Sequence, residues 1–163
     1  MVDAAKLLGV DVMTGHWDFT YGEERIKKIV EQDFAGKIDF VAQNVKTSDF
    51  GDPVFKPYVM REINGVRCAV IGQAFPYTPI ANPRYFVPDW TFGIQEENLQ
   101  KVVDEVRAKG AQLVVLLSHN GMIAPEVHSA ALPTSGEMSA DATVTSRNAA
   151  MSRGSDRISG RCR

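Results

Sequence analysis

Two of the three histidines occupy matched positions in the sequence, and their residue type suits metal binding. His16 follows the short apolar run 10–13, and His119 follows the apolar run 111–117. Each lies in a short polar loop with a glycine within two residues, which lets the backbone approach a ligand closely. A neutral imidazole held at a strand end is a common metal ligand. The alternative is that each histidine only caps its strand, and the residues alone leave both interpretations open.

Other reactive side chains carry weaker signals. Asp18 lies two residues after His16 and is either a carboxylate partner for it or a favourable charge at the start of the next helix. Cys68 is expected to be a small buried hydrophobic residue, and His128 is given no role. The sequence contains no phosphate-binding glycine loop, no nucleophile elbow and no H-E-x-x-H motif.

The elements that would position the histidines follow from hydrophobic periodicity and turn signals. Asn64-Gly65 predicts a two-residue type I′ turn between two strands. The pattern predicts an α/β fold with helices on the faces of a sheet, and in such sheets ligand groups lie past the carboxyl ends of strands. The predicted helices are 2–8, 22–34 and 95–109, and the predicted strands are 10–13, 39–43, 58–63, 66–71 and 111–117, the last one buried on both faces.

Composition divides the chain into two unequal segments. The 163 residues carry 18 Lys and Arg against 20 Asp and Glu, so bulk charge gives no reason to expect a nucleic-acid or membrane partner. Every aromatic residue and every lysine lies in residues 1–122, whereas residues 123–163 are rich in Ser, Ala and Arg. We therefore expect one α/β unit over 1–122, followed by a disordered, low-complexity tail over 123–163.

Two short motifs resemble those of a known enzyme family. Residues 15–22, Gly-His-Trp-Asp-Phe-Thr-Tyr-Gly, resemble the G-N-H-E-F-D-x-G motif of the calcineurin-like metallophosphoesterases in their 5′-nucleotidase branch. Residues 116–122, Leu-Leu-Ser-His-Asn-Gly-Met, are similar to a later motif of that family. Residues 42–45 and 72–94 are similar to stretches of the sulfate thiol hydrolases within this branch. The resemblance covers essentially all of residues 1–122 and implies a partial metallophosphoesterase-type α/β sandwich with a β-hairpin.

The resemblance implies a dinuclear metal hydrolase, usually with two Mn²⁺ ions, that works in the periplasm. Its substrate would be a cysteine S-thiosulfonate on the carrier protein SoxYZ, from which it would release sulfate. His16 would stand in the position of a metal-binding Asn, and His119 in that of a metal-binding His. Trp17 replaces the catalytic His of the nucleotidases and would form a substrate wall.

The proline- and aromatic-rich loop over residues 72–93 is the second place where the resemblance implies a role. Arg84, Tyr77, Tyr85 and Trp90 would line the substrate channel, with Arg84 meeting the anionic sulfonate through bidentate hydrogen bonds. The alternative is that the aromatic residues only pack the loop onto the sheet.

Several motifs of the family have no counterpart in this sequence. The early D-x-H motif, the G-D motif and the later G-H-x-H motif are all missing. We therefore expect residues 1–122 to be an internal fragment of the catalytic domain, and residues 123–163 to be non-native or frame-shifted. We also expect the isolated chain to be inactive and to hold no metal stably. The alternatives are a 5′-nucleotidase-like phosphoesterase and a non-catalytic binding module that keeps part of the fold.

Overall fold

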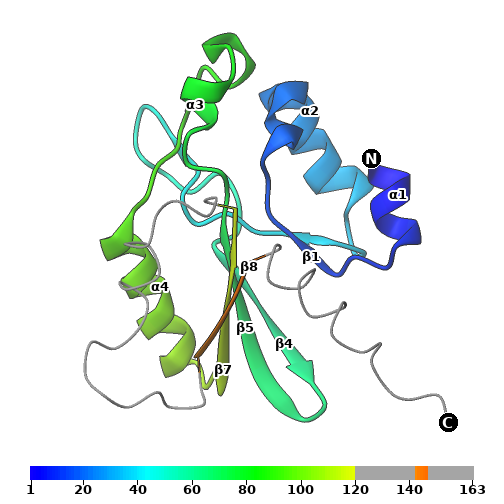
Figure 1. The fold of residues 1–163 in the computed structure, drawn as a ribbon, viewed down its shortest axis with the longest axis vertical. Coiled ribbons are helices and arrows are strands. Elements are labelled where there is room, and N and C mark those ends of the chain that lie inside the picture. The colour runs from blue at the N-terminus through cyan, green and yellow to red at the C-terminus, as the bar shows by residue number, and fades with distance from the viewer. Residues whose placement is uncertain (120–141, 147–163) are drawn as a thin grey trace, which may run out of the picture.

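A computed structural model describes residues 1–119 and the backbone of residues 142–146 (Figure 1). The mixed α/β architecture confirms the predicted fold class. In chain order the elements are α1 (Val2–Leu7), β1 (Val12–Met13), η1 (Trp17–Tyr21), α2 (Glu23–Lys28), η2 (Ile29–Asp33), β2 (Asp39–Phe40), β3 (Lys46–Thr47), β4 (Tyr58–Ile63), β5 (Val66–Gln73), α3 (Thr78–Ala81), η3 (Arg84–Phe86), β6 (Trp90–Thr91), α4 (Glu96–Ala108), β7 (Leu113–Ser118) and β8 (Ala142–Ser146). Among the helices of these residues, none is long and apolar enough to span a membrane.

The described strands form three sheets, whereas the sequence suggested a single one. β1 pairs with β2 in parallel, β3 pairs with β6 antiparallel, and the largest sheet has the order β4-β5-β7-β8. The division arises because residues 41–43 cross from one sheet to another. The Val41 N–H donates to the carbonyl of Met13, and the Gln43 N–H donates to the carbonyl of Gly72, each at 2.8 Å. The β1–β2 sheet thus ends after two residue pairs, and the chain beyond it hydrogen bonds to β5 through Gln43.

The β4–β5 hairpin confirms the turn predicted from Asn64-Gly65. Both turn residues have positive φ, at 52° and 79°, as a type I′ turn requires. The strands pair antiparallel from Tyr58 opposite Ile71 to Ile63 opposite Val66. Beyond Ile71, β5 continues to Gln73 in parallel pairing with β7, so that its end lies beside the end of β7.

Helix α4 covers one face of the largest sheet (Figure 1). The four inward residues predicted from periodicity are all buried, and they pack against β5 and β7: Leu99, Val102, Val103 and Val106. Each such side chain stabilises the fold by about 1.5–3 kcal/mol when it is fully buried. This layer fixes β7, and hence the chain position from which His119 extends.

Strand β7 corrects the prediction of a strand buried on both faces. Val114, Leu116 and Ser118 are buried, whereas the alternate residues Leu113, Val115 and Leu117 are only partly covered. The reason is that α4 packs on one face of this strand, while the other face carries no comparable layer among the described residues. A continuous apolar run does not by itself distinguish these two situations.

A second core holds the N-terminal half together. Phe19, Ile26, Phe34 and Phe40 come from the elements between η1 and β2, and they pack with Phe55 and Trp90 from later in the chain. The 72–93 segment therefore contributes to the core, and it contains α3, η3 and β6 in place of the expected irregular loop. Its buried residues Ala74, Val87 and Trp90 belong to that core.

One strand lies within the segment predicted as a tail. The backbone of β8 pairs in parallel with β7, from Val114 opposite Ala142 to Ser118 opposite Ser146. Of residues 123–163, the structure describes only this five-residue backbone segment. The other residues of that segment, including His128, lie outside the described residues.

Candidate functional site

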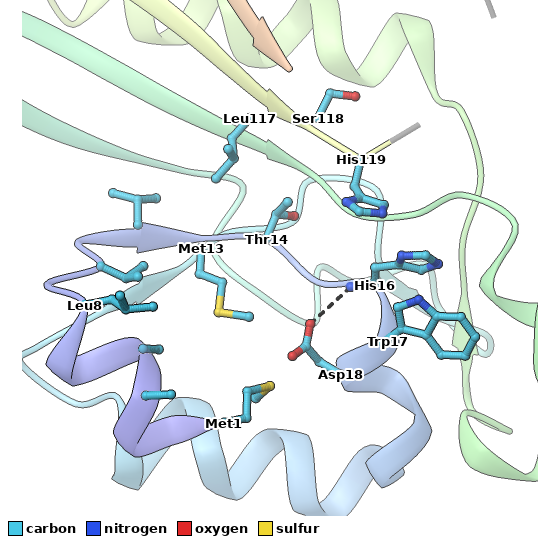
Figure 2. A pocket seen from close by; sticks show the side chains of 14 residues that line it. Met1, Leu8, Met13, Thr14, His16, Trp17, Asp18, Leu117, Ser118 and His119 are labelled. Carbon is cyan, nitrogen blue, oxygen red and sulfur yellow. Dashed lines mark hydrogen bonds between the residues drawn. The ribbon is translucent and has the colours of Figure 1, made fainter. Parts of the chain in front are cut away.

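The structure brings the two matched histidines together. His16 precedes η1 and follows β1, and His119 directly follows β7. Their ring centroids lie 4.2 Å apart with an interplanar angle of 43°. Figure 2 shows the two imidazoles side by side, reached from strands that belong to different sheets. The sequence prediction that these two residues share one site is consistent with this geometry.

The electrostatic environment favours the neutral form of His16. Burial lowers the pKa of the His16 imidazole below its usual value, and the neighbouring His119 lowers it further. Asp18 opposes these effects by attracting the protonated ring. A neutral imidazole keeps a nitrogen lone pair available, which is the form that binds metal ions.

Aromatic rings surround His16. The Phe75 ring centroid lies 4.2 Å from that of His16, and the Trp17 indole lies 5.3 Å from it. Trp17 is 68% exposed, so its indole forms an open wall beside the histidine pair (Figure 2). An arrangement of this kind, with an aromatic face next to polar nitrogens, suits a ligand that has both apolar and anionic parts.

Asp18 supports the loop that carries His16. Its buried carboxylate accepts a hydrogen bond from the backbone N–H of His16 at 3.2 Å, drawn in Figure 2. The contact is with the backbone, and no described contact joins the carboxylate to the imidazole as a hydrogen bond. Asp18 thus orders the start of η1 through the backbone, and its charge acts on the His16 imidazole without a hydrogen bond.

A cavity of about 350 Å³ opens next to the histidine pair. Its walls come from α1, from β1 and from the end of β7, and Thr14 and Ser118 lie among its lining residues. The Thr14 hydroxyl is buried and has no hydrogen-bond partner among the described residues. A buried, unpaired hydroxyl costs free energy, so this atom marks a polar position where a ligand could bond.

The described residues fit a metal ion only in part. Two imidazoles suit a transition metal, and the lowered pKa of His16 supports that use. Nevertheless, no group of three or more His, Cys, Asp or Glu side chains is placed to hold a metal within the described residues. A Mn²⁺ pair prefers carboxylate and water ligands. His16 and His119 can therefore supply two ligands, and the described residues do not complete a dinuclear site.

The residues expected to line a substrate channel have different environments. Tyr77 and Tyr85 are exposed, at 46% and 75%, and Arg84 is exposed as well. Trp90, by contrast, is 4% exposed and packs edge-on against Phe55 at 5.2 Å in the N-terminal core. For Trp90 the structure corrects the channel assignment, because a ring buried among core aromatics cannot contact a substrate.

Three residues near the site are not among those predicted from the sequence. Phe75 packs on His16, Thr14 carries the unpaired hydroxyl, and Asn44 is buried beneath the site with its side chain fully hydrogen bonded. Only Asn44 left a usable signal, since it follows Gln43 as a polar pair inside a stretch that otherwise reads as a buried strand. Two adjacent polar residues there indicate a buried hydrogen-bond network.

Comparison with solved structures places this fold among known hydrolases. The sulfate thiohydrolase SoxB of Thermus thermophilus, solved with glycerol, is 38% identical over 74% of this chain and 22% of its own, with a TM-score of 0.69. A 5′-nucleotidase precursor of Thermus thermophilus is 29% identical over 74% of this chain and 23% of its own, with a TM-score of 0.61. The calcineurin-like phosphoesterase YfkN of Bacillus subtilis has a TM-score of 0.63 at 24% identity and covers 74% of this chain and 38% of its own.

Curated relatives give the same picture from sequence. A 2′,3′-cyclic-nucleotide 2′-phosphodiesterase/3′-nucleotidase of Yersinia enterocolitica is 28% identical over 66% of this chain and 18% of its own length. Protein UshA from the same species is 26% identical over 82% of this chain and 24% of its own. The chain thus spans about a fifth to a quarter of these relatives, and no protein-family model matches it. The described residues carry part of the calcineurin-like phosphoesterase fold, and the proteins that they match are hydrolases of the phosphoesterase and nucleotidase type together with one sulfate thiohydrolase.

Proposed function

We propose that this chain is part of a metal-dependent hydrolase that releases sulfate from a cysteine S-thiosulfonate on the carrier protein SoxYZ. The observation that carries the proposal is the pair of imidazoles 4.2 Å apart with the exposed Trp17 beside them. The higher identity to the sulfate thiohydrolase than to the 5′-nucleotidase of the same organism, 38% against 29%, supports this choice of substrate. A periplasmic location belongs to the same proposal.

His16 and His119 would each supply one nitrogen ligand to the metal site. Two Mn²⁺ ions, when bound, would supply an activated water as nucleophile and polarise the sulfonate oxygens. The other ligands would come from outside the described residues. In this scheme the chain's own contribution is to keep His16 neutral by burial and to hold the two rings close together.

Trp17 supports a sulfur leaving group over an oxygen one. An alcohol leaves as a strongly basic alkoxide and needs a general acid, whereas a cysteine S-thiosulfonate that loses sulfate to water leaves the cysteine persulfide anion. That anion is less basic than a thiolate, whose thiol has a pKa of about 8.5, and it leaves without a general acid. The indole cannot donate a proton as an acid, so this position suits a sulfur leaving group. As an exposed aromatic surface, together with Tyr77, Tyr85 and the guanidinium of Arg84 on the separate 72–93 segment, it would contact the carrier's substrate-bearing arm and its anionic group.

The second candidate is a 5′-nucleotidase-like phosphoesterase. The curated relatives with phosphodiesterase and nucleotidase names favour it. Against this candidate, position 17 offers no general acid for an alcohol leaving group, because this sequence has Trp there. A non-catalytic module that retains part of the fold is the third candidate.

A segment exchange distinguishes these candidates. Residues 1–119 of this chain would replace the matching segment of the Thermus thermophilus sulfate thiohydrolase, and in a second chimera that of the 5′-nucleotidase. We expect sulfate release from SoxYZ carrying the thiosulfonate in the first chimera, and little phosphate release from AMP in the second. The reverse result would support the nucleotidase. If both chimeras fold and neither is active, the binding module is supported instead.

Two substitutions in the first chimera sharpen the test. His16→Ala should abolish sulfate release, because a metal ligand is lost, while Ile80→Ala on the exposed side of α3 serves as the control. Trp17→His should raise phosphomonoesterase activity by supplying the acid. If that activity does not rise, the residue at position 17 does not determine which leaving group the enzyme accepts. The isolated chain should neither bind a Mn²⁺ pair nor turn over, so stoichiometric binding with hydrolysis would contradict this expectation.

A further inference from the structure

Three residues at the end of β5 connect the two histidines through the backbone. We call Gln73, Ala74 and Phe75 the bridge. On one side, the His119 N–H donates to the carbonyl oxygen of Gln73 at 3.0 Å. On the other side, the Phe75 N–H donates to the carbonyl oxygen of Gly15 at 3.1 Å, one residue before His16. The bridge thus sets where both histidine-bearing loops lie.

The middle of the bridge is held by a single side chain, Asn44. The Ala74 N–H donates to Asn44 Oδ1 at 2.8 Å, and Asn44 Nδ2 donates to the Ala74 carbonyl oxygen at 2.9 Å. Asn44 Nδ2 also donates to the Gly93 carbonyl oxygen at 3.0 Å. Asn44 and Ala74 are both fully buried. The carboxamide therefore satisfies both backbone groups of Ala74, as the backbone of a paired strand would, and no water can replace it.

A second set of amides holds the side chain of Gln73, the first residue of the bridge. Gln43 Nε2 donates to Gln73 Oε1, and Gln73 Nε2 donates to the Gly93 carbonyl oxygen at 3.3 Å. From helix α4, Asn98 Nδ2 donates to the Gln43 carbonyl oxygen at 3.2 Å. Asn98 thus holds Gln43, whereas Asn44 holds the bridge itself. This difference makes Asn98 a matched comparison for Asn44.

We propose that Asn44 is the positioning residue of the histidine pair, which sets the separation of the His16 and His119 rings by fixing the backbone of the bridge. The importance of that separation rests on the proposed function, in which the two rings are metal ligands. Asn44 itself lies beneath the site and touches neither ring in the described contacts. It acts through Ala74, with Gln73 passing the constraint to His119 and Phe75 passing it to Gly15 and His16.

The separation of the rings can be measured on the full 163-residue chain without metal or substrate. Rings whose centroids are 4.2 Å apart give a nuclear Overhauser cross-peak between their protons. We expect this cross-peak to be lost in Asn44→Leu, which has similar volume and no hydrogen-bonding groups, while the amide signals of the β4–β5 hairpin remain. Asn98→Leu should keep the cross-peak, although it too removes a partly buried amide.

A milder variant keeps the test decisive if Asn44→Leu does not fold. Asn44→Asp retains the acceptor for the Ala74 N–H and loses both donations, so it should weaken or abolish the cross-peak in a folded chain. A cross-peak as strong as wild type in either folded variant would overturn the proposal. So would equal loss in Asn98→Leu, or loss of the hairpin signals in both Asn44 variants, since these show a general role in the fold. None of these outcomes depends on catalysis, and the hydrolase proposal is judged separately by the chimeras.

Discussion

Gly72→Ala is expected to be the most damaging small substitution near the site. A Cβ at this position would lie 2.0 Å from the carbonyl oxygen of Val41 and 2.3 Å from its carbonyl carbon. Ordinary contacts begin at 3.4 Å, so the two backbone segments would have to separate by well over 1 Å. Gly72 is not among the glycines with positive φ, and the requirement here is therefore space rather than conformation.

The expected cost follows from the bonds that cross this contact. The Gly72 N–H donates to the Pro57 carbonyl oxygen at 3.1 Å, and the Gly72 carbonyl accepts from the Gln43 N–H at 2.8 Å. Losing both would cost about 1–3 kcal/mol. Forced overpacking adds about 1–3 kcal/mol. We expect the free energy of unfolding to fall by about 2–6 kcal/mol, a large share of the roughly 5–15 kcal/mol typical of a whole domain.

Urea unfolding of the 163-residue chain, followed by far-ultraviolet circular dichroism, measures this change. Gly51→Ala is the control, because Gly51 has φ +71° and no atom within 4 Å of its added Cβ. Its expected cost is about 1 kcal/mol, from the left-handed conformation alone. If Gly72→Ala lowers the unfolding free energy no more than Gly51→Ala does, the close crossing of β5 and residues 41–43 is not what Gly72 serves.

Three further predictions concern the site and its surroundings. Thr14→Val should leave the unfolding free energy within about 0.5 kcal/mol of wild type or raise it, because the buried hydroxyl has no partner among the described residues; a loss above about 1 kcal/mol in urea unfolding would contradict this. The pKa of His16 is lower in the folded chain than in the unfolded chain, where it is about 6.5, so between these two values only the unfolded chain binds the proton. The free energy of unfolding should therefore fall as the pH drops below about 6.5, and His16→Asn should flatten this part of its pH profile. Trp90→Ala should cost about 3–5 kcal/mol and Trp17→Ala no more than about 0.5 kcal/mol, and similar midpoints for the two variants would show that their burial differs less than the structure indicates.

The sequence was most informative where one local signal determines one local structure. Asn64-Gly65 specified the hairpin because two adjacent residues with positive φ leave few other turns. The four inward residues of α4 followed from a periodicity sustained over 13 residues. His16 and His119 were predicted to occupy matched positions because each follows an apolar run. Residues that follow strands can come together in an α/β fold, and these two rings lie close to each other.

Predictions failed where burial depends on partners far along the chain. Trp90 lies in a proline-rich segment without periodicity, and its core partners Phe19 and Phe55 come from other parts of the chain. Asn44 finds its partners 30 and 49 residues away, so the polar pair that it forms with Gln43 indicates a buried network but does not identify the groups it bonds. Whether β7 is covered on one face or two depends on what packs there, and its apolar composition is the same in either case.

The histidine pair is formed by a route that differs from the rule that predicted it. That rule places ligand groups at the carboxyl ends of neighbouring strands in one sheet, where strand spacing of about 4.8 Å would fix their separation. Here β1 and β7 belong to different sheets, so strand pairing does not set the distance between His16 and His119. The bridge connects the two ends instead, through one hydrogen bond to His119 and one to Gly15. A displacement of Ala74 by a fraction of an ångström would therefore change the ring separation directly, and the geometry of the site depends on the one side chain, Asn44, that holds Ala74 on both of its backbone groups.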